Sequence, residues 1–228
     1  MTGVLHTVLQ MIEKGATHIG VATDHVIESF RNDLWPGYKT SEGIEPALLA
    51  QFHPLEDALA SMGVVVWPMV ELEADDALAS AAHLAAADPR GGKVRGDRVV
   101  QMHRRTNLIH DAEGVQTKFG VPPERIPDFL ALVGDSADGY PGIDGIGEVG
   151  AARLIRQHGS LEQFPPAVLG ASREQALLFK KLATLSVDAA LFGNVDDLQW
   201  HGTRADFEQW TARIGDARLL ARARTALK

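Results

Sequence analysis

The chain has 228 residues, a formal net charge of −8, 45% hydrophobic residues and no cysteine. This length suits one large domain or two small ones, and the acidic balance argues against a broad nucleic-acid contact surface. The sequence has no cysteine, no long apolar run and no signal pattern. It therefore excludes disulfides, thiolate zinc sites, cysteine nucleophiles and membrane spans, and it predicts a cytoplasmic protein.

The first part of the chain predicts a helix followed by a strand. A helical stripe runs from Val4 to Ile12 and ends at Gly15, and 18–22 has the pattern of a short strand. Asp24 stands at the end of this strand. In an α/β sheet, ligand groups lie at the carboxyl ends of strands, so Asp24 is a candidate site residue. A strand-end Asp that caps a turn is the alternative.

The next segment mixes aromatic and basic side chains. Phe30, Trp35 and Tyr38 alternate with Arg31 and Lys39. Bases of a nucleic acid stack on aromatic rings while cations contact phosphates, so this mixture suits a nucleic-acid contact. A surface loop with a few buried anchors explains the composition equally well.

A second helix and strand precede an acidic helix start. We predict one helix over 45–62 that ends at Gly63, with Leu48 and Leu49 on its apolar stripe, and a buried strand over 64–67.

Three acidic residues then fall within four positions. Glu73 and Asp76 are three apart and share one face of a helix that continues to about residue 87, and Asp75 is adjacent. The helix dipole favours acids in a first turn, so capping is one explanation. Three acids directly after a strand exceed what capping needs, which favours a site.

The middle of the chain predicts a helix, a glycine-rich hairpin and a second helix. The first helix ends near Gly134, and Val149, Ala152 and Ile155 share one face of the second. Glycines in the hairpin let backbone N–H groups approach a ligand, and the helix that follows presents free donors, so this turn suits a phosphate. A plain glycine turn between packed helices is the alternative.

The C-terminal part is less distinctive. Helices are predicted from the capping-box spacing of Ser160 and Gln163 and over 173–186. Core or interface anchors are expected at Trp200, Phe207 and Trp210. We expect a basic stripe on the last helix, formed by Arg213, Arg218, Arg222 and Arg224. We favour a solvated face over a DNA contact for this stripe.

The hairpin sequence Gly-Asp-Ser-Ala-Asp-Gly-Tyr-Pro-Gly-Ile-Asp-Gly-Ile-Gly, residues 134–147, resembles the helix–hairpin–helix signature of the 5′-nuclease (flap endonuclease) family. It is most similar to the 5′→3′ exonuclease domains of bacterial DNA polymerase I and their freestanding homologues. Two further segments match: Asp24 with the following Ser-Phe-Arg and Tyr-Lys, and Glu-Ala-Asp-Asp-x-x-Ala from Glu73. The resemblance covers residues 2–188.

The resemblance implies an α/β fold with two domains. Residues 1–119 would form a PIN-like 5′-nuclease (resolvase-like) domain, and 120–228 a helix–hairpin–helix (H3TH) DNA-binding and helical region. The implied reaction is hydrolysis of DNA phosphodiesters by a 5′→3′ exonuclease or structure-specific flap endonuclease, with two Mg²⁺ or Mn²⁺ ions. Expected partners are DNA with 5′ ends, flaps or nicks and a DNA polymerase, and we expect a monomer.

The resemblance also implies roles for particular residues. The implied metal ligands are Asp24, Glu73, Asp75, Asp76, Asp135 and Asp138. The catalytic group would comprise Lys39 and Arg31, facing the scissile phosphate, with Asp75 and Asp76. DNA contacts, with K⁺ at the hairpin, are implied for Tyr38, Gly142, Gly145, Ile146, Gly147, Arg153, Lys180 and Lys181.

The sequence departs from the family pattern at two places. Relatives open with a central strand that ends in Asp, and they carry a Thr-x-Asp-Lys-Asp-like segment after the acidic helix; the sequence matches neither. The resemblance therefore predicts a fold that lacks two inner strands and three metal ligands. The alternative to an active nuclease is a catalytically impaired DNA-binding relative or a truncated form.

Overall fold

The computed structural model describes residues 1–88, 100–103 and 108–226. The chain forms two compact units, each built from separated stretches of sequence. The first unit contains Met1–Ile27, Ser41–Asp88 and Val187–Lys228, and the second contains Glu28–Thr40 and Pro89–Ser186. The division into 1–119 and 120–228 stays a prediction.

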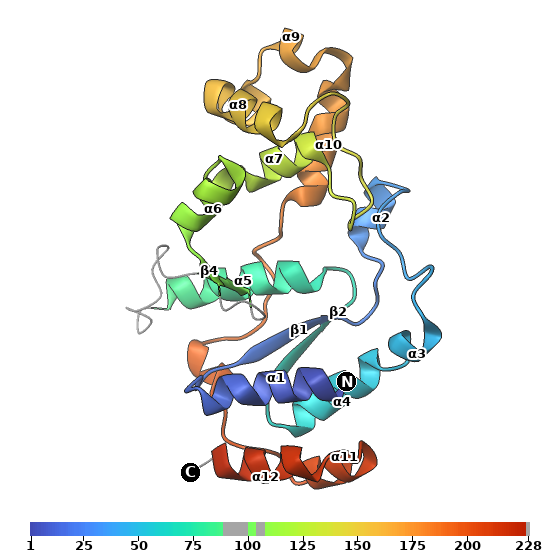
Figure 1. Cartoon of the computed structure of the whole chain (residues 1–228), viewed down its shortest axis with the longest axis vertical. Coiled ribbons are helices and arrows are strands. Elements are labelled where there is room, and N and C mark those ends of the chain that lie inside the picture. The colour runs from blue at the N-terminus through green and yellow to red at the C-terminus, as the bar shows by residue number, and fades with distance from the viewer. Residues whose placement is uncertain (89–99, 104–107, 227–228) are drawn as a thin grey trace. The chain divides into compact units, whose positions relative to one another are not determined.

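The first unit is a small α/β layer structure. It consists of α1 (Thr2–Glu13), β1 (Gly20–Asp24), α3 (Pro46–Leu49), α4 (Phe52–Ser61), β2 (Val65–Met69), α5 (Ala74–Ala87), the 3-10 helix η5 (Val195–Leu198), α11 (Phe207–Arg213) and α12 (Ala217–Ala226). Strands β1 and β2 pair in parallel, with Asp24 opposite Met69. Helix α5 lies on one side of this pair, and α1 and α4 lie on the other (Figure 1). In the described ranges the parallel sheet has these two strands, in agreement with the predicted lack of inner strands.

Apolar side chains on one face of each helix close the core of the first unit. Helix α1 buries Leu5, Val8, Leu9 and Ile12 of the predicted stripe, whereas Val4, which begins that stripe, is exposed. These side chains pack in one cluster with Leu59 and Met62 of the α4 region, Phe207 of α11 and Leu219 of α12. Spacing at three and four residues thus places apolar groups on one side of each helix, where burial stabilises the unit.

The single helix predicted over 45–62 is wrong: the structure has two helices, α3 and α4. Pro54 explains the break, because in a continuous helix it could not donate to the carbonyl of Ala50 and its ring would clash there. With α4 beginning at Phe52, Pro54 falls in the first turn, where no donor is needed. Leu48 and Leu49 are consequently exposed, at 51% and 40%, and not on a buried stripe.

The second unit is mainly helical. It consists of α2 (Phe30–Leu34), β3 (Gln101–His103), β4 (Leu108–His110), α6 (Ala112–Phe119), η2 (Pro123–Arg125), α7 (Ile126–Val133), α8 (Glu148–His158), η3 (Leu161–Gln163), α9 (Pro166–Leu169), η4 (Gly170–Ser172) and α10 (Arg173–Ala183). Strands β3 and β4 form an antiparallel pair with Met102 opposite Ile109. Helix α7 ends at Gly134 and α8 at Gly159, as the glycine pattern predicts.

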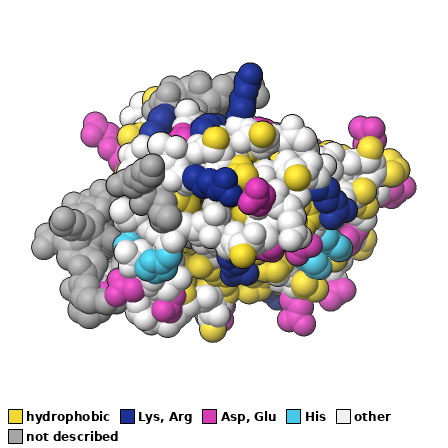
Figure 2. Space-filling model, turned by 90° about the horizontal axis from the view of Figure 1, so that it is seen from below, with side chains coloured by type: hydrophobic (Ala, Val, Ile, Leu, Met, Phe, Trp, Pro, Cys, Tyr) yellow, Lys and Arg dark blue, Asp and Glu magenta, His cyan; other side chains and the backbone are white. Residues whose placement is uncertain are grey.

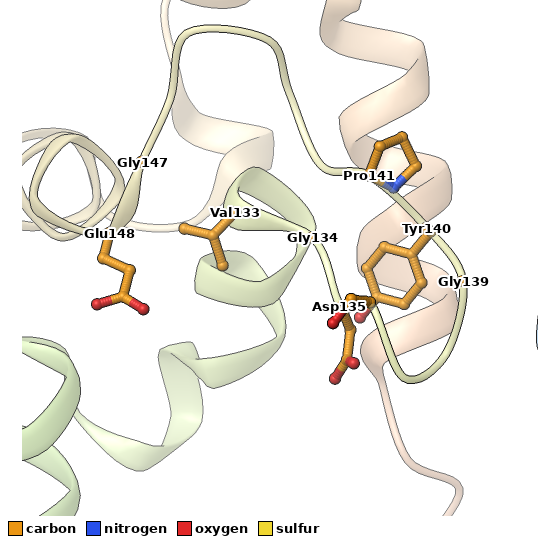
Figure 3. A pocket seen from close by; sticks show the side chains of 9 residues that line it. Val133, Gly134, Asp135, Gly139, Tyr140, Pro141, Gly147 and Glu148 are labelled. Atoms are coloured by element: carbon orange, nitrogen blue, oxygen red, sulfur yellow. The ribbon is translucent and has the colours of Figure 1, made fainter.

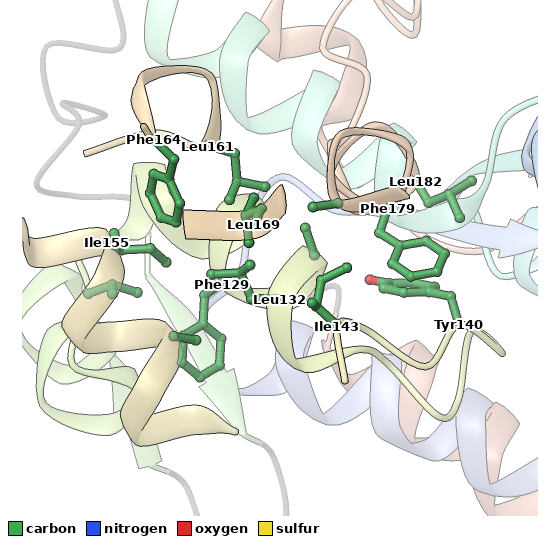
Figure 4. Packing of buried hydrophobic residues seen from close by; sticks show 14 of the residues in the cluster. Phe129, Leu132, Tyr140, Ile143, Ile155, Leu161, Phe164, Leu169, Phe179 and Leu182 are labelled. Carbon is green, nitrogen blue, oxygen red and sulfur yellow. The ribbon is translucent and has the colours of Figure 1, made fainter. Parts of the chain in front are cut away.

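Aromatic and aliphatic side chains around α7 and α10 form the core of the second unit. Figure 4 shows Phe129 and Leu132 of α7 together with Phe179 of α10 and Tyr140 of the hairpin. The rings of Tyr140 and Phe179 lie 5.3 Å apart. This packing attaches the glycine-rich loop to the helices on either side of it.

The buried face of α8 differs from the predicted one. Val149 is 84% exposed, whereas Ala151, Ala152 and Ile155 are buried. Val149 lies in the first turn of α8, which follows directly on the exposed end of the hairpin. The small side chains of Ala151 and Ala152 instead let α8 approach the rest of the core closely.

None of the helices within the described residues is both long enough and apolar enough to cross a lipid bilayer.

Candidate functional site

Asp24 reaches the start of α5 from the end of β1. Its Oδ1 accepts a hydrogen bond from the backbone N–H of Ala74 at 2.7 Å. The parallel register sets this contact, because Asp24 lies opposite Met69 at the end of β2 and the chain then passes directly into α5. The carboxyl ends of the two strands and the amino end of α5 therefore meet at Asp24.

Glu73 and Asp76 form a reciprocal capping box at the same helix start. The N–H of Glu73 donates to Asp76 Oδ2 at 2.9 Å, and the Glu73 side chain accepts from the N–H of Asp76. Both side chains are buried, whereas Asp75 is exposed. The capping explanation for this acidic run is therefore confirmed, because the amides and dipole of α5 stabilise both buried carboxylates. A metal site at these acids stays a prediction.

A buried glutamate that the sequence analysis did not identify supports this corner of the first unit. Glu56 of α4 accepts from Thr23 Oγ1 at 2.6 Å, and its other oxygen lies 2.7 Å from His25 Nδ1. The ring of His25 stacks on His53 with centroids 4.0 Å apart. Glu56 therefore holds the residues on both sides of Asp24. No sequence signal indicates this contact, because its partners are about thirty positions apart.

A small cavity adjoins Asp24 in the first unit. It has a volume of about 270 Å³ and is lined by Thr23, Asp24, Ile27, Phe52 and Leu55. Most of its lining is apolar, so Asp24 is the charged group that this cavity presents.

In the second unit, Asp135 and Asp138 lie in a closed loop at the start of the hairpin. Asp135 Oδ1 accepts from the N–H groups of Ala137 at 2.9 Å and Asp138 at 3.3 Å. Backbone hydrogen bonds in both directions pair Asp135 with Tyr140. The loop therefore holds the two acids in a fixed turn.

Lys39 lies against this acidic loop. Its N–H donates to the carbonyl of Asp138 at 3.0 Å, and its Nζ lies 3.4 Å from Asp138 Oδ1. The sequence predicts both residues for one site, and within the second unit they are in contact.

Arg31 and Tyr38 are buried in the second unit. Arg31 is 1% exposed, and its Nε donates to the carbonyl of Leu182 at 2.8 Å. Tyr38 is 3% exposed and belongs to the hydrophobic core. Tyr38 serves as a buried anchor, one of the two explanations for the composition of this segment, whereas Phe30 and Trp35 are half-buried. A DNA contact by Tyr38 stays a prediction.

The hairpin borders a cavity of about 530 Å³ (Figure 3). Its lining includes Asp135, Tyr140, Gly147 and Glu148, and Figure 3 shows the carboxylates of Asp135 and Glu148 on different walls. Burial raises the pKa of the Tyr140 hydroxyl far above its ordinary value, and the charges of Asp135 and Asp138 raise it further. The phenol is therefore neutral at any physiological pH.

The glycines of the hairpin have distinct roles. Gly142 is buried at φ +75°, where a Cβ would collide with the backbone of Leu132 and Val133. Gly145 and Gly147 are exposed, and nothing lies within 4 Å of a Cβ added at either. Gly147 is the N-cap of α8 and supplies no side-chain cap, so the first amides of that helix lie at an open surface. This is the geometry that a phosphate contact requires.

The two lysines predicted to contact DNA have different surroundings. Lys180 Nζ lies 2.7 Å from Oδ1 of the buried Asp128 and 2.8 Å from Glu162 Oε2. Burial lowers the pKa of Lys180, but hydrogen bonds to both carboxylates outweigh it, so the pKa lies above its ordinary value. Lys181 and Arg153 are exposed. A DNA contact stays a prediction for all three.

The arginines near the C-terminus do not form one stripe, and Arg222 and Arg224 belong to ion pairs. Arg213 lies on α11 and not on the last helix, and its guanidinium lies over the ring of Trp210. Arg222 pairs with Glu13 at 2.6 Å, and Arg224 pairs with Glu208 at 2.9 Å. On the face drawn in Figure 2, Lys and Arg side chains are scattered singly and some lie beside acidic ones. These contacts support the favoured reading of a solvated surface.

Sequence models of one protein family match most of the chain. The model described as "5′-3′ exonuclease, N-terminal resolvase-like domain" matches residues 1–118. The model described as "5′-3′ exonuclease, C-terminal SAM fold" matches residues 121–206.

Individual proteins with names of the same kind are also similar to this chain. Flap endonuclease Xni of Cronobacter sakazakii is 33% identical over 222 residues, which cover 87% of this chain and 88% of that protein. DNA polymerase I of Bacillus caldotenax is 31% identical over 220 residues, covering 84% of this chain and 25% of the polymerase. The chain thus spans about a quarter of its DNA polymerase I relatives.

Solved structures agree at the level of the fold. T5 5′-exonuclease with bound zinc superposes with a TM-score of 0.64 at 21% identity, covering 99% of this chain and 89% of that one. The catalytic core of Rad2 in complex with DNA substrate superposes with a TM-score of 0.58 at 14% identity, covering 97% and 84%. Together with the family models, these findings show that the chain belongs to the 5′-3′ exonuclease family, with a resolvase-like N-terminal domain and a C-terminal SAM-type helical fold.

Proposed function

We propose that this chain is a metal-dependent 5′→3′ nuclease that hydrolyses phosphodiesters of DNA at 5′ ends, flaps or nicks. The observation that carries the proposal is the meeting of Asp24 with Glu73 and Asp76 at the amino end of α5, directly beyond two parallel strands. The names of the relatives, flap endonuclease and 5′-3′ exonuclease, support the same reaction.

The donor atoms available suit a hard divalent cation. Every candidate ligand is a carboxylate, the ligand type that Mg²⁺ and Mn²⁺ prefer, and the chain has no cysteine. In the described ranges no three His, Cys, Asp or Glu side chains are placed to hold a metal ion. Buried carboxylates that now accept helix amides would have to turn one oxygen toward a cation. When bound, such cations would supply an activated water and stabilise the leaving oxygen.

Residues of each unit receive a role in this proposal. Asp24, Glu73, Asp75 and Asp76 are the proposed ligands of the first unit. In the second unit, Asp135 and Asp138 are the proposed ligands, and Lys39 would offset negative charge on the phosphate.

The hairpin would bind the DNA backbone. The amides around Gly145, Ile146 and Gly147 would donate to a phosphate, with K⁺ as the accompanying monovalent ion. Arg153 and Lys181 would add exposed positive charge. Because phosphate contacts position a duplex without reading its bases, substrate choice would follow DNA shape and not sequence.

A DNA polymerase is the proposed partner. The relatives include DNA polymerase I, of which the matched region makes up about a quarter. A nuclease of this type would remove the 5′ strand that polymerisation displaces.

Cleavage of a labelled 5′-flap duplex in Mg²⁺ or Mn²⁺ tests the proposal. Asp75→Asn should abolish chelator-sensitive cleavage, whereas Asp57→Asn, an exposed acid of α4 in the same unit, should not change it. Binding without cleavage in either metal would favour the impaired DNA-binding relative. If the folded protein neither binds nor cleaves the DNA, that result contradicts both hypotheses.

A further inference from the structure

We infer that Arg31 is a positioning residue, which clamps the 29–39 segment to the end of α10 and so holds Lys39 beside Asp138, and that it is not a ligand of the DNA phosphate. The inference deepens the proposed function, on which it rests, because it states how one part of that site is assembled.

The Arg31 side chain is fully engaged inside the second unit. It is 1% exposed and is among the largest fully buried side chains in the described residues. Its Nε donates to the carbonyl of Leu182 at 2.8 Å and its Nη2 to the carbonyl of Thr184 at 3.2 Å. Its guanidinium carbon lies 4.6 Å from the centroid of the Phe30 ring. A phosphate would have to displace these contacts to reach the guanidinium.

The acceptors explain why a cation lies there. Leu182 is in the last turn of α10 and Thr184 is its C-cap. The last carbonyls of a helix have no partner within the helix and carry the negative end of its dipole. A guanidinium presents several donors in a planar fork and reaches two such carbonyls together, whereas a lysine offers one point charge.

A chain of hydrogen bonds leads from Arg31 to the acidic loop. One residue further, Asn32 Nδ2 donates to the carbonyl of Lys39 at 3.0 Å. Trp35 Nε1 donates to the carbonyl of Gly139 at 3.1 Å, and the N–H of Lys39 donates to the carbonyl of Asp138 at 3.0 Å. Anchoring α2 at Arg31 therefore fixes both ends of the contact that places Lys39 Nζ next to Asp138.

Salt dependence of DNA binding separates the two roles. Affinity for a 5′-flap duplex is measured at several salt concentrations in chelator, so that no cleavage is needed. Each phosphate contact that is lost lowers the slope of log K against log salt by about 0.9. Arg31→Met should weaken binding roughly tenfold, the scale of a lost hydrogen bond to a charged group. Because Lys39 itself is proposed to face a phosphate, the slope is compared in a Lys39→Met background, where adding Arg31→Met should leave it unchanged. Lys181→Met, an exposed cation of α10, is the matched control expected to lower the slope.

Two further variants test the same point. Arg31→Lys keeps the charge but loses the planar fork that reaches two carbonyls, and Arg31→Gln loses the charge as well. A positioning role predicts that both variants bind DNA more weakly than the wild-type protein, whereas a direct phosphate contact would be kept by Arg31→Lys. An affinity close to that of the wild-type protein in Arg31→Lys, or a slope lowered further when Arg31→Met is added to Lys39→Met, would overturn the inference.

Hydrogen exchange provides a readout that does not need DNA. Without DNA, the amides of Trp35 to Lys39 should exchange faster in Arg31→Met than in the wild-type protein, while amides of α4 in the first unit stay unchanged. If the wild-type protein fails to bind DNA but exchange changes in this way, the proposed function fails and the clamp stands. Unchanged exchange over this segment would remove the clamp whatever the result with DNA.

Discussion

Two neighbouring lysines on α10 show how residue type alone misleads at the residue scale. Lys180 neutralises Asp128, whose side chain is 1% exposed, whereas Lys181 faces solvent. We predict that Lys180→Met lowers the free energy of unfolding by about 2 kcal/mol, because it removes the closer of the two cations, Lys180 and Arg125, that pair with a buried carboxylate. Lys181→Met should change stability by less than about 0.5 kcal/mol and weaken DNA binding. Urea unfolding and DNA titration of both variants check this.

One result would support a direct contact between Lys180 and DNA. That result would be a Lys180→Met protein of wild-type stability with reduced affinity for DNA. Equal stability losses in both variants would instead mean that α10 is sensitive to any substitution.

Tyr140 carries a polar atom with no partner within the described residues. Its hydroxyl is buried and makes no hydrogen bond there. An unsatisfied buried hydroxyl costs about 1–3 kcal/mol, so Tyr140→Phe should raise the free energy of unfolding by about 1 kcal/mol while keeping the ring contact with Phe179. Thermal and urea unfolding measure the change. A less stable Tyr140→Phe protein would mean that an ordered water satisfies the hydroxyl.

The sequence does not show which side chains come into contact when their residues are far apart along the chain. The acids at Asp24 and after Glu73 are identifiable because each directly follows a strand. The supporting role of Glu56 and the buried contacts of Arg31 are not identifiable, because the partners in question lie 31 and 151 positions away or more. A sequence shows that Arg31 is charged, but only the fold shows that its charge faces helix carbonyls.

At the scale of elements, glycines and prolines decide where helices end. The ends of α7 and α8 are predictable because glycine follows each, and the break before α4 requires weighing Pro54 against a continuous leucine pattern. On the predicted face of α8, Ala152 and Ile155 are buried as expected and Val149 is exposed, because spacing alone does not indicate whether the first turn contacts the core. Local chemistry therefore predicts element boundaries better than element faces.

The hairpin before α8 allows stability and DNA binding to be separated. Gly145 has φ +78°, so Gly145→Ala should cost about 1 kcal/mol of stability through backbone strain. Gly147 has φ −87° and is the N-cap of α8, so Gly147→Ser should raise stability by a few tenths of a kcal/mol. The new hydroxyl would also compete with a phosphate for the free amides and weaken DNA binding. Unchanged affinity in Gly147→Ser would show that these amides do not bind DNA.

The ion pair between Glu162 of η3 and Lys180 of α10 predicts that the free energy of unfolding depends on pH. Hydrogen bonding from Lys180 lowers the pKa of Glu162 from 4.5 to about 2. A carboxyl with a lower pKa in the folded state contributes stability above its unfolded pKa, and this contribution disappears as the pH falls from about 4.5 to 2. The contribution is small, because the Glu162 side chain is 56% exposed and screened by water.

Glu162→Gln isolates this contribution. The wild-type protein should be more stable than Glu162→Gln at pH 6, and the difference should shrink toward zero between pH 4.5 and 2. Urea unfolding of both proteins across this range measures it, and high salt should reduce the difference at pH 6. A difference that does not vary with pH would mean that packing, and not charge, explains the effect of the substitution.

At the scale of the whole molecule, the net charge of −8 conflicts with a DNA-binding role unless cations intervene. Candidate metal ligands account for much of the negative charge at the proposed site. We therefore predict that Ca²⁺, a hard cation with the same preference for oxygen, tightens binding of a 5′-flap duplex relative to chelator, whereas added monovalent salt weakens it. Fluorescence anisotropy with labelled DNA measures both effects.

Removing one proposed ligand should reduce the gain from Ca²⁺ specifically. Asp75→Asn would bind DNA at least as tightly as the wild-type protein in chelator, because it removes one negative charge, but it would gain less on adding Ca²⁺. Asp57→Asn removes the same charge from the exposed face of α4 and should keep the full gain. If both variants keep it, divalent ions merely screen the surface, and the acids at the start of α5 serve that helix alone.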